Sequence, residues 1–177
     1  MTYIYTDGSC KSNGNAAALG GTGVVILEGE NIIHTHHQTY SHTTNNRMEY
    51  KSMIYGMKWC IDQNIRNPTF VSDSKLLLDT IQTWMYGWAK KGWKKAGTGE
   101  SSKIKNLDLV LELWELVPKL QNPSYQWVKG HNGDTYNDMA DELTNMIESE
   151  NAVEDKTNTE LLKANNCELK MAARASD

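Results

Sequence analysis

The chain has 177 residues and a formal net charge of −4, with 39% hydrophobic and 23% charged residues. This length and composition are typical of one globular domain with a substantial core, and no apolar run approaches the roughly 20 residues of a membrane-spanning helix. The first residues lack a secretion signal, and the net acidity excludes an overall basic surface, so any nucleic-acid partner must be met by a local patch.

The first part of the chain alternates between apolar and polar residues in the manner of β-strands. Strands are predicted over residues 2–6, 23–27 and 32–40, with a Glu-Gly-Glu-Asn turn between the last two. Three consecutive strands with short connections indicate an antiparallel meander. A helix over about residues 46–63 follows, because apolar residues recur there at helical spacing.

The rest of the chain alternates between helices and short strands. Pro68 ends the connection that follows the first helix. The predicted elements are then a buried strand at 69–72, helices at 74–84 and 105–117, a strand at 125–129 and a helix at 136–147. Their order predicts an α/β domain in which a mixed sheet is covered by helices.

A change of composition near Ile147 indicates a domain boundary. Residues 148–177 contain seven acidic and four basic residues, a net charge of −3, which leaves −1 for residues 1–147. The first part of this acidic C-terminal appendage is polar enough for a linker. We expect the appendage to be disordered or loosely docked, apart from a short helix within residues 160–174.

Four acidic residues fall at predicted strand ends and helix starts, where α/β sheets gather their sites. Asp7 ends the first strand, Glu49 lies in the first turns of the first helix, Asp73 ends the fourth strand, and Asp141 lies near the start of the last helix. Converging carboxylates without basic partners repel one another and resist ionisation. A divalent cation resolves that conflict, and oxygen ligands favour Mg²⁺ or Mn²⁺ over zinc.

Each acid also has a simpler interpretation when it is taken alone. Asp7 is a common turn former, Asp73 is a suitable helix cap, and Asp141 in a first helical turn is stabilised by the helix dipole. Only the set of four favours a metal site. The histidines of the third strand, His34 and His36 on one face, are interpreted as solvated or partly packed residues rather than zinc ligands.

The segments YTDGSC, TTNNRMEY, VSDSK, WVKGHNGD and NDMADEL, in this order, resemble the type 1 ribonuclease H family. The stretch WMYGWAKKGWKKAGTGESSKIKNLDL resembles the basic protrusion of its bacterial members. The resemblance implies a ribonuclease H-like fold for residues 1–147, with a five-stranded mixed sheet of three antiparallel and two parallel strands flanked by helices. It also implies an endoribonuclease that hydrolyses the RNA strand of RNA–DNA hybrids and leaves 5′-phosphate and 3′-hydroxyl ends.

The resemblance assigns catalytic roles to five residues. Asp7 matches the acid that bridges two Mg²⁺ ions, for which Mn²⁺ is a substitute, and Glu49 and Asp73 match the other ligands of one ion. Asp141 matches the acid that helps to hold the second ion and the attacking water. His131, in KGHNGD, matches a loop histidine that would move protons or assist product release.

The substrate-binding residues carried over from the family lie in loops and in the protrusion. Lys75 stands where we associate a glutamine with bacterial members, and a lysine there would meet a phosphate. The stretch GNAAALGG, residues 14–21, is a second departure that would alter the approach to the site. Trp84 follows an apolar helix, so it is also expected to anchor the protrusion on the core. The predicted substrate-binding residues are Cys10, Asn13, Thr44, Asn46, Lys75, Trp84, Trp88, Lys90, Lys91, Lys94 and Lys95.

Two other functional classes remain open at this point. Another polynucleotidyl transferase of the same fold would share dispersed acids but lack TTNNRME together with a tryptophan-bearing protrusion. A catalytically silent hybrid-binding module would be marked by loss of one acid, and all four are present.

The three cysteines are odd in number and not in metal-ligand spacing, which indicates reduced thiols. We expect a cytoplasmic monomer whose partner is the hybrid and not a membrane.

Overall fold

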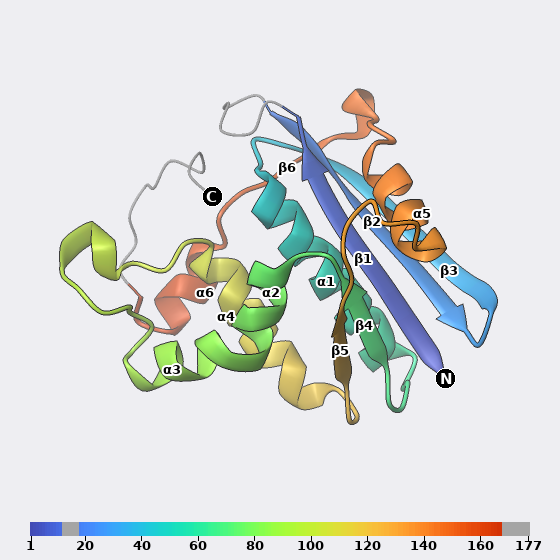
Figure 1. Ribbon diagram of the computed structural model, residues 1–177. Coiled ribbons are helices and arrows are strands. Elements are labelled where there is room, and N and C mark those ends of the chain that lie inside the picture. Colours follow the sequence, from blue (N-terminus) through green and yellow to red (C-terminus); the bar gives the residue numbers. More distant parts are fainter. Residues whose placement is uncertain (12–17, 168–177) are drawn as a thin grey trace.

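The computed structural model describes residues 1–11 and 18–167 and is built around one mixed sheet (Figure 1). The strands are β1 (Thr2–Cys10), β2 (Leu19–Glu28), β3 (Asn31–Ser41), β4 (Thr69–Ser72), β5 (Ser124–Trp127) and β6 (Val153–Glu154). They lie in the order β5-β4-β1-β2-β3-β6. β1, β2 and β3 are antiparallel, while β4 is parallel to β1 and β5 is parallel to β4. The predicted five-stranded mixed sheet is confirmed, and β6 adds a short sixth strand parallel to β3.

Helices cover both faces of this sheet. The helices are α1 (Asn45–Asp62), α2 (Lys75–Asp79), α3 (Met85–Lys90), α4 (Leu107–Leu116), α5 (Thr135–Thr144) and α6 (Thr159–Ala164). Because side chains alternate along a strand, Val24 and Ile26 of β2 belong to the larger core with α1, while Val25 and Leu27 pack with α5. Figure 1 shows α1 and α5 on opposite faces accordingly. Every helix in the described ranges is too short or too polar to cross a lipid bilayer.

The helix that follows β4 is longer than the sequence indicates. It was predicted to end at Trp84, but a π-helical turn, Thr80–Trp84, joins α2 directly to α3, and the helical path continues to Lys90. The Thr80 hydroxyl donates to the carbonyl of Leu76, 2.8 Å away, within this region. The described helical segments also include three 3₁₀ turns, Gly99–Ser102, Val117–Lys119 and Ser149–Asn151.

The first strand also differs from its prediction, and Asp7 does not end it. β1 runs to Cys10 because its pairing with β2 continues as far as Cys10 and Gly20. On the other side of β1, the parallel pairing with β4 stops at Tyr5 and Val71. Asp7 therefore lies inside β1 but two residues beyond Tyr5, the last residue of β1 that pairs with β4.

The described part of the acidic appendage is docked on the domain rather than extended as a linker. β6 pairs with Tyr40 and Ser41 of β3, and Asp155 is only 1% exposed. Burial of this carboxylate is possible because it forms ion pairs with Arg47 and Lys51. The predicted helix over 160–174 is present as α6 up to Ala164, and residues 168–174 lie outside the described residues.

Two glycines of β2 let α5 lie directly against the sheet. An added Cβ at Gly21 would lie 2.2 Å from the carbonyl oxygen of Thr144, and one at Gly23 would lie 2.1 Å from that of Ala140. Neither neighbour can rotate away, because both are backbone atoms of a helix. This close contact fixes the helix that carries Asp141.

Replacing Gly21 by alanine should therefore lower the free energy of unfolding by about 2–3 kcal/mol, the upper range for overpacking a core. Gly87→Ala is the matched control, because an added Cβ at this position of α3 meets nothing within 4 Å. There the helix propensity of alanine should raise stability by up to about 1 kcal/mol. Urea unfolding of both variants measures this difference, and equal effects at the two positions would refute the close-packing explanation.

Candidate active site

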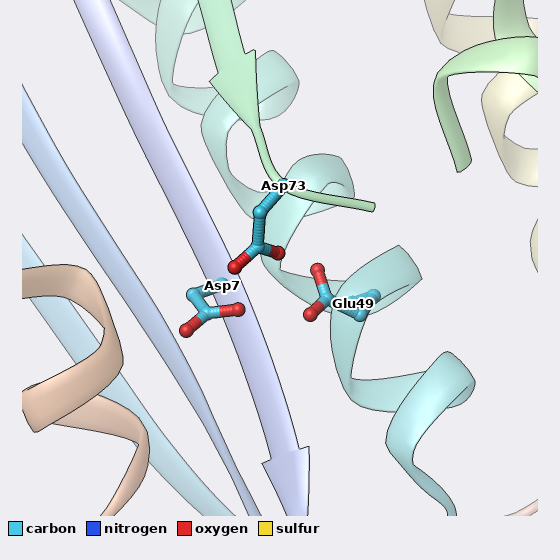
Figure 2. A group of neighbouring side chains, drawn as sticks. All are labelled: Asp7, Glu49 and Asp73. Atoms are coloured by element: carbon cyan, nitrogen blue, oxygen red, sulfur yellow. The ribbon is translucent and has the colours of Figure 1, made fainter. Parts of the chain in front are cut away.

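Three carboxylates from separate elements meet where β4 ends beside β1. Asp7 comes from β1, Glu49 from α1 and Asp73 from the residue directly after β4, and one oxygen of each lies within 4.8 Å of the other two. Figure 2 shows the carboxylate groups pointing toward one another. Asp73, predicted at the end of the fourth strand, is the residue directly after β4, and the prediction that Glu49 lies in the first turns of the first helix is confirmed.

Strand register and one glycine bring the three together. Tyr5 pairs with Val71 across the parallel strands, so Asp7 and Asp73 each lie two residues further along the same direction. Gly8 allows α1 to approach β1, since an added Cβ would lie 2.3 Å from the backbone nitrogen of Glu49. The position of Glu49 is thus set by a backbone contact with the strand that carries Asp7.

The crowding of negative charge shifts the ionisation of all three groups. Burial, with a contribution from Asp73, raises the pKa of the Asp7 carboxyl to about 7, even though a hydrogen bond with Glu49 opposes the change. Burial and the charge of Asp7 raise the pKa of Glu49 well above its usual value. Burial and the charge of Asp141 raise the pKa of Asp73. Each shift means that an isolated negative charge is disfavoured at this position.

The trio has the properties of a site for a hard divalent cation. Its donors are all carboxylate oxygens, the set that Mg²⁺ and Mn²⁺ prefer. The Oε2 atom of Glu49 is buried and has no hydrogen-bond partner among the described residues, so one strong acceptor is left for a ligand. A cation would satisfy this atom and compensate the charges that burial disfavours.

The fourth predicted acid, Asp141, lies beside the trio rather than within it. Its charge raises the pKa of Asp73, and its side chain hydrogen-bonds that of Asp7. The prediction that Asp141 lies near the start of its helix is wrong, because α5 runs from Thr135 to Thr144 and Asp141 is in the last turn. The helix dipole disfavours a negative charge there, so the dipole cannot explain this residue.

His131 lies in the loop before α5 and faces Asp141. Its Nδ1 atom is 3.9 Å from Oδ2 of Asp141, and its side chain is 80% exposed. The backbone of His131 has a φ of 55°, a left-handed conformation that is uncommon outside glycine. The histidine is therefore free to meet a substrate while it remains close to the acidic cluster.

Three residues around Asp73 were not identified from the sequence. Asn137 is buried and hydrogen-bonds the Asp73 carboxylate, which lowers the pKa of that group. The indole of Trp127 donates to the Asp73 carbonyl at 3.1 Å, and an added Cβ on Gly130 would lie 2.8 Å from Asp73 Oδ2. Asn137 stands four residues before Asp141, on the same face of a helix, and this spacing was the available signal.

The predicted substrate-binding residues near the site differ in their surroundings. Thr44 is fully buried and caps α1, since its hydroxyl accepts from the backbone N–H of Arg47. The backbone N–H of Cys10 donates to Asn45 at 2.6 Å. Asn46 is half-buried in the first turn of α1, and Asn13 lies outside the described residues.

The lysines predicted to bind the substrate are exposed at the surface, and the tryptophans near them differ in burial. The side chain of Lys75 is exposed, and its ammonium lies 5.7 Å from the ring centre of Trp127. Trp88 packs against the larger core together with Trp93, whereas Trp84 is 40% exposed. The expectation that Trp84 anchors the protrusion on the core is therefore wrong, because its ring is exposed and lies beside that of Trp88, with 6.1 Å between ring centres. The exposed lysines of the protrusion are Lys90, Lys91, Lys94 and Lys95.

The third strand places two of its histidines against aromatic residues of α1. His34 Nε2 lies 2.7 Å from the hydroxyl of Tyr55, and the His36 ring stacks on Tyr55 with 3.7 Å between ring centres. Both histidines thus lie on one face of β3, as predicted, and both are partly packed.

Comparison with known proteins identifies the family. A family model described as RNase H matches residues 1–148. The chain is 38% identical over 149 residues to "Ribonuclease HI" of Neisseria meningitidis serogroup B, with 81% of this chain and 92% of that protein covered. It is also 38% identical over 142 residues to "Ribonuclease H" of Polynucleobacter asymbioticus, with 80% and 86% covered. The crystal structure of LC9-RNase H1, a type 1 RNase H with the type 2 active-site motif, superimposes with a TM-score of 0.71 at 27% identity and covers 96% of this chain and 86% of that one.

Proposed function

The chain belongs to the ribonuclease H family, type 1, and from this premise we propose that it hydrolyses the RNA strand of RNA–DNA hybrids with two bound divalent cations, leaving 5′-phosphate and 3′-hydroxyl ends. As a member of that family it is a ribonuclease H, a hydrolase of phosphodiester bonds. The observation that carries the finer proposal is the meeting of Asp7, Glu49 and Asp73 within 4.8 Å, with Oε2 of Glu49 left without a partner among the described residues.

The carboxylates provide ligands for two cations, Mg²⁺ or Mn²⁺. Asp7, Glu49 and Asp73 would hold one, and Asp7 with Asp141 would hold the second. When bound, such ions supply stabilisation of the anionic phosphate and of the leaving oxygen, and they lower the pKa of a bound water. The raised pKa of Asp7 and Glu49 supports this role, since both groups have a strong electrostatic reason to accept a cation.

The side chains orient the water and move its protons. In the proposed reaction, the oxygen of a water held by Asp141 forms a bond to phosphorus, and the bond from phosphorus to the 3′ oxygen breaks. The 3′ oxygen leaves with a proton, so the products carry a 5′-phosphate and a 3′-hydroxyl. His131, with Nδ1 3.9 Å from Asp141, is placed to take a proton from the water or to assist release of the 5′-phosphate.

We expect two sets of residues to bind the substrate, one near the carboxylates and one in the protrusion. By the family resemblance, Asn13 and Asn46 would approach the RNA backbone and the minor groove, where RNA shows its 2′-hydroxyls. The main chain at Cys10 would lie beside the substrate, and Thr44 would hold a DNA-strand phosphate. Lys75 would meet a phosphate nearby. Farther away, the exposed lysines of the protrusion, with Trp84 and Trp88, would contact DNA-strand phosphates, which makes hybrid binding salt-dependent.

The domain organisation and setting of the enzyme are also part of the proposal. Residues 1–147 form the catalytic domain, a division supported by the family match to residues 1–148. Residues 148–177 form the appendage. Cys10, Cys60 and Cys167 form no disulfide in the structure, which supports a reducing compartment such as the cytoplasm. We expect the enzyme to act as a monomer.

Three labelled substrates test the proposed reaction: an RNA–DNA hybrid, duplex DNA and duplex RNA. We expect cleavage of the RNA strand of the hybrid alone, in Mg²⁺ or Mn²⁺, and no cleavage in chelator or by an Asp73→Asn variant. The fragment downstream of the cut should accept a kinase-transferred phosphate only after phosphatase treatment, since its new 5′ end already carries one. Cleavage that persists in chelator, or equal cleavage of duplex DNA, would refute the mechanism.

A further inference from the structure

A second charged cluster lies on the side of α1 away from the carboxylate trio, and it is more deeply buried than the trio. Arg47, Asp108 and Asp155 are each 1–2% exposed. Arg47 is in the first turn of α1, Asp108 in the first turn of α4, and Asp155 directly after β6. Three distant parts of the chain therefore converge on the helix that carries Glu49.

The geometry of the cluster leaves the guanidinium no freedom. Arg47 donates from Nη1 and Nη2 to Asp108, both at 2.9 Å, and from Nε and Nη2 to Asp155, at 2.7 and 3.0 Å. A fifth bond runs from Nη1 to Asn106 at 3.4 Å. All five N–H groups of the side chain thus have acceptors, and two bidentate pairs fix its plane.

The charges of the cluster are balanced. Lys51, one turn further along α1, lies 3.5 Å from Asp155 and supplies a second positive charge. Burial opposes ionisation of both aspartates, but the hydrogen bonds and the positive charge of Arg47, with smaller contributions from other neighbours, together hold the pKa of Asp108 and of Asp155 below the usual value. The cluster is therefore charged and paired at neutral pH.

Asp155 fastens the start of α1 at two points. Besides its bonds to Arg47, its Oδ2 atom accepts from the hydroxyl of Thr43 at 2.8 Å, and Thr43 directly precedes the helix cap. The backbone N–H of Asp155 donates to the Ser41 carbonyl at 2.9 Å, which ties the aspartate to the end of β3. The first turn of α1 is thereby joined to the sheet through a residue that lies beyond the family match to residues 1–148.

Glu49 is two residues after Arg47 on this same turn. On its other side the turn contacts β1, where the absence of a Cβ at Gly8 allows the backbone of Met48 and Glu49 to approach. Movement of the turn away from β1 would carry Glu49 away from Asp7 and Asp73. The clamp formed by Asp155, Arg47 and Asp108 resists that movement.

We propose that Asp155 is a positioning residue for the active site: through Arg47 and Thr43 it holds the first turn of α1, and so the Glu49 carboxylate, at the distance from Asp7 and Asp73 that binds a divalent cation. The inference rests on the proposed function, because it concerns the same carboxylates. It makes the docked appendage a working part of the catalytic domain.

The test uses the full chain, and Mn²⁺ alone as the probe. Asp155→Asn keeps the size of the side chain but removes its charge, and should weaken Mn²⁺ binding by about ten-fold, the scale seen when groups that orient metal ligands are lost. Isothermal calorimetry measures the dissociation constant well below the melting temperature. Glu154→Gln is the matched control, because Glu154 is an exposed neighbour whose ion pair with Lys156 is 3.7 Å long, and this variant should bind Mn²⁺ like the wild type.

Hybrid cleavage adds a readout that a purely structural role would leave unmoved. For Asp155→Asn, the Mn²⁺ concentration for half-maximal cleavage should rise by about the same ten-fold factor. Saturating Mn²⁺ should restore kcat, and KM for the hybrid should not change. A lower melting temperature with an unchanged Mn²⁺ dissociation constant would overturn the proposal and leave the cluster a role in stability alone.

A milder variant keeps the test decisive if Asp155→Asn does not fold. Thr43→Val removes one hydrogen bond to Asp155 and leaves the guanidinium pairs intact, so a smaller loss of Mn²⁺ affinity, about three-fold, is expected. An unchanged affinity in this variant would count against the proposal. If the wild type binds Mn²⁺ but does not cleave the hybrid, the proposed function fails, while the comparison of dissociation constants still decides the positioning role.

Discussion

Replacing Asp7 by asparagine should lower the rate of hybrid cleavage by about a thousand-fold or more, the scale of loss when a group that acts directly on the transition state is removed. Asp7 lies between the other acids, since it hydrogen-bonds Glu49 and Asp141 and feels the charge of Asp73. Asparagine keeps the shape but offers one neutral oxygen instead of a charged pair. Single-turnover cleavage in saturating Mg²⁺ measures the effect on chemistry rather than on substrate binding.

The same substitution should make the metal-free protein more stable at neutral pH. The pKa of Asp7 is about 7 in the folded protein, above its value in an unfolded chain, so the folded state binds more protons between about pH 4 and 7 and loses stability as the pH rises through that window. Asparagine removes this cost, and the gain at pH 8 should be on the order of 2 kcal/mol. Urea unfolding in chelator measures it, and the gain should shrink as the pH is lowered toward 4.

Asp62→Asn is the control for both measurements, because Asp62 is the exposed last residue of α1. This variant should cleave the hybrid like the wild type and change stability by less than about 0.5 kcal/mol, as surface substitutions usually do. Retention of more than about a tenth of the activity in Asp7→Asn would contradict its role as a ligand. A loss of stability in the metal-free variant would contradict the account of charge repulsion.

Metal binding should weaken steeply as the pH falls below 7. A cation needs the ionised carboxylates, and burial raises the pKa of Asp7 to about 7 and that of Glu49 above its usual value. Below pH 7 binding must therefore displace the proton that Asp7 holds in the metal-free protein. With one displaced proton of pKa about 7, the apparent Mn²⁺ dissociation constant should rise about ten-fold between pH 8 and pH 6.

Calorimetry in two buffers of different ionisation enthalpy tests this prediction directly. At pH 6.5 the observed heat should depend on the buffer, because protons are released into it, and at pH 8.5 the dependence should be small. The Glu154→Gln variant, whose change lies on the exposed surface, should follow the wild type. A dissociation constant that does not vary with pH, with no proton release, would mean that the carboxylates are already ionised in the metal-free protein.

Much of the architecture was predictable because it is local in sequence. Strand β4 begins and ends where the prediction placed it, and α1 is displaced by one residue at each end. Both have strong short-range signals: Pro68 before the strand and a long apolar stripe in the helix. The errors occur at element ends that are set by contacts with residues distant in the sequence. β1 extends past Asp7 because β2 continues to pair with it, and α5 ends at Thr144, which puts Asp141 in the last turn rather than the first.

The active-site acids show the same division. Asp7, Glu49, Asp73 and Asp141 were identified from the sequence because each stands in a short motif of fixed residue types. Their separation was not predictable, since it depends on the pairing of Tyr5 with Val71 and on the close approach that Gly8 permits. The contacts of Asn137 and Trp127 with Asp73 likewise depend on how the end of β5 and the start of α5 meet β4.

The sequence by itself determined the fold class, the family and the acids that make a metal site, because periodicity and short motifs are properties of neighbouring residues. The tertiary structure alone decided how close those acids lie and that burial raises the pKa of Asp7 and of Glu49. It also decided that Asp155, which the sequence left in a polar appendage, is buried against Arg47 at the root of the helix that carries Glu49. The two charged residues of this buried pair are more than a hundred positions apart in the chain. Their contact therefore could not be predicted from local composition.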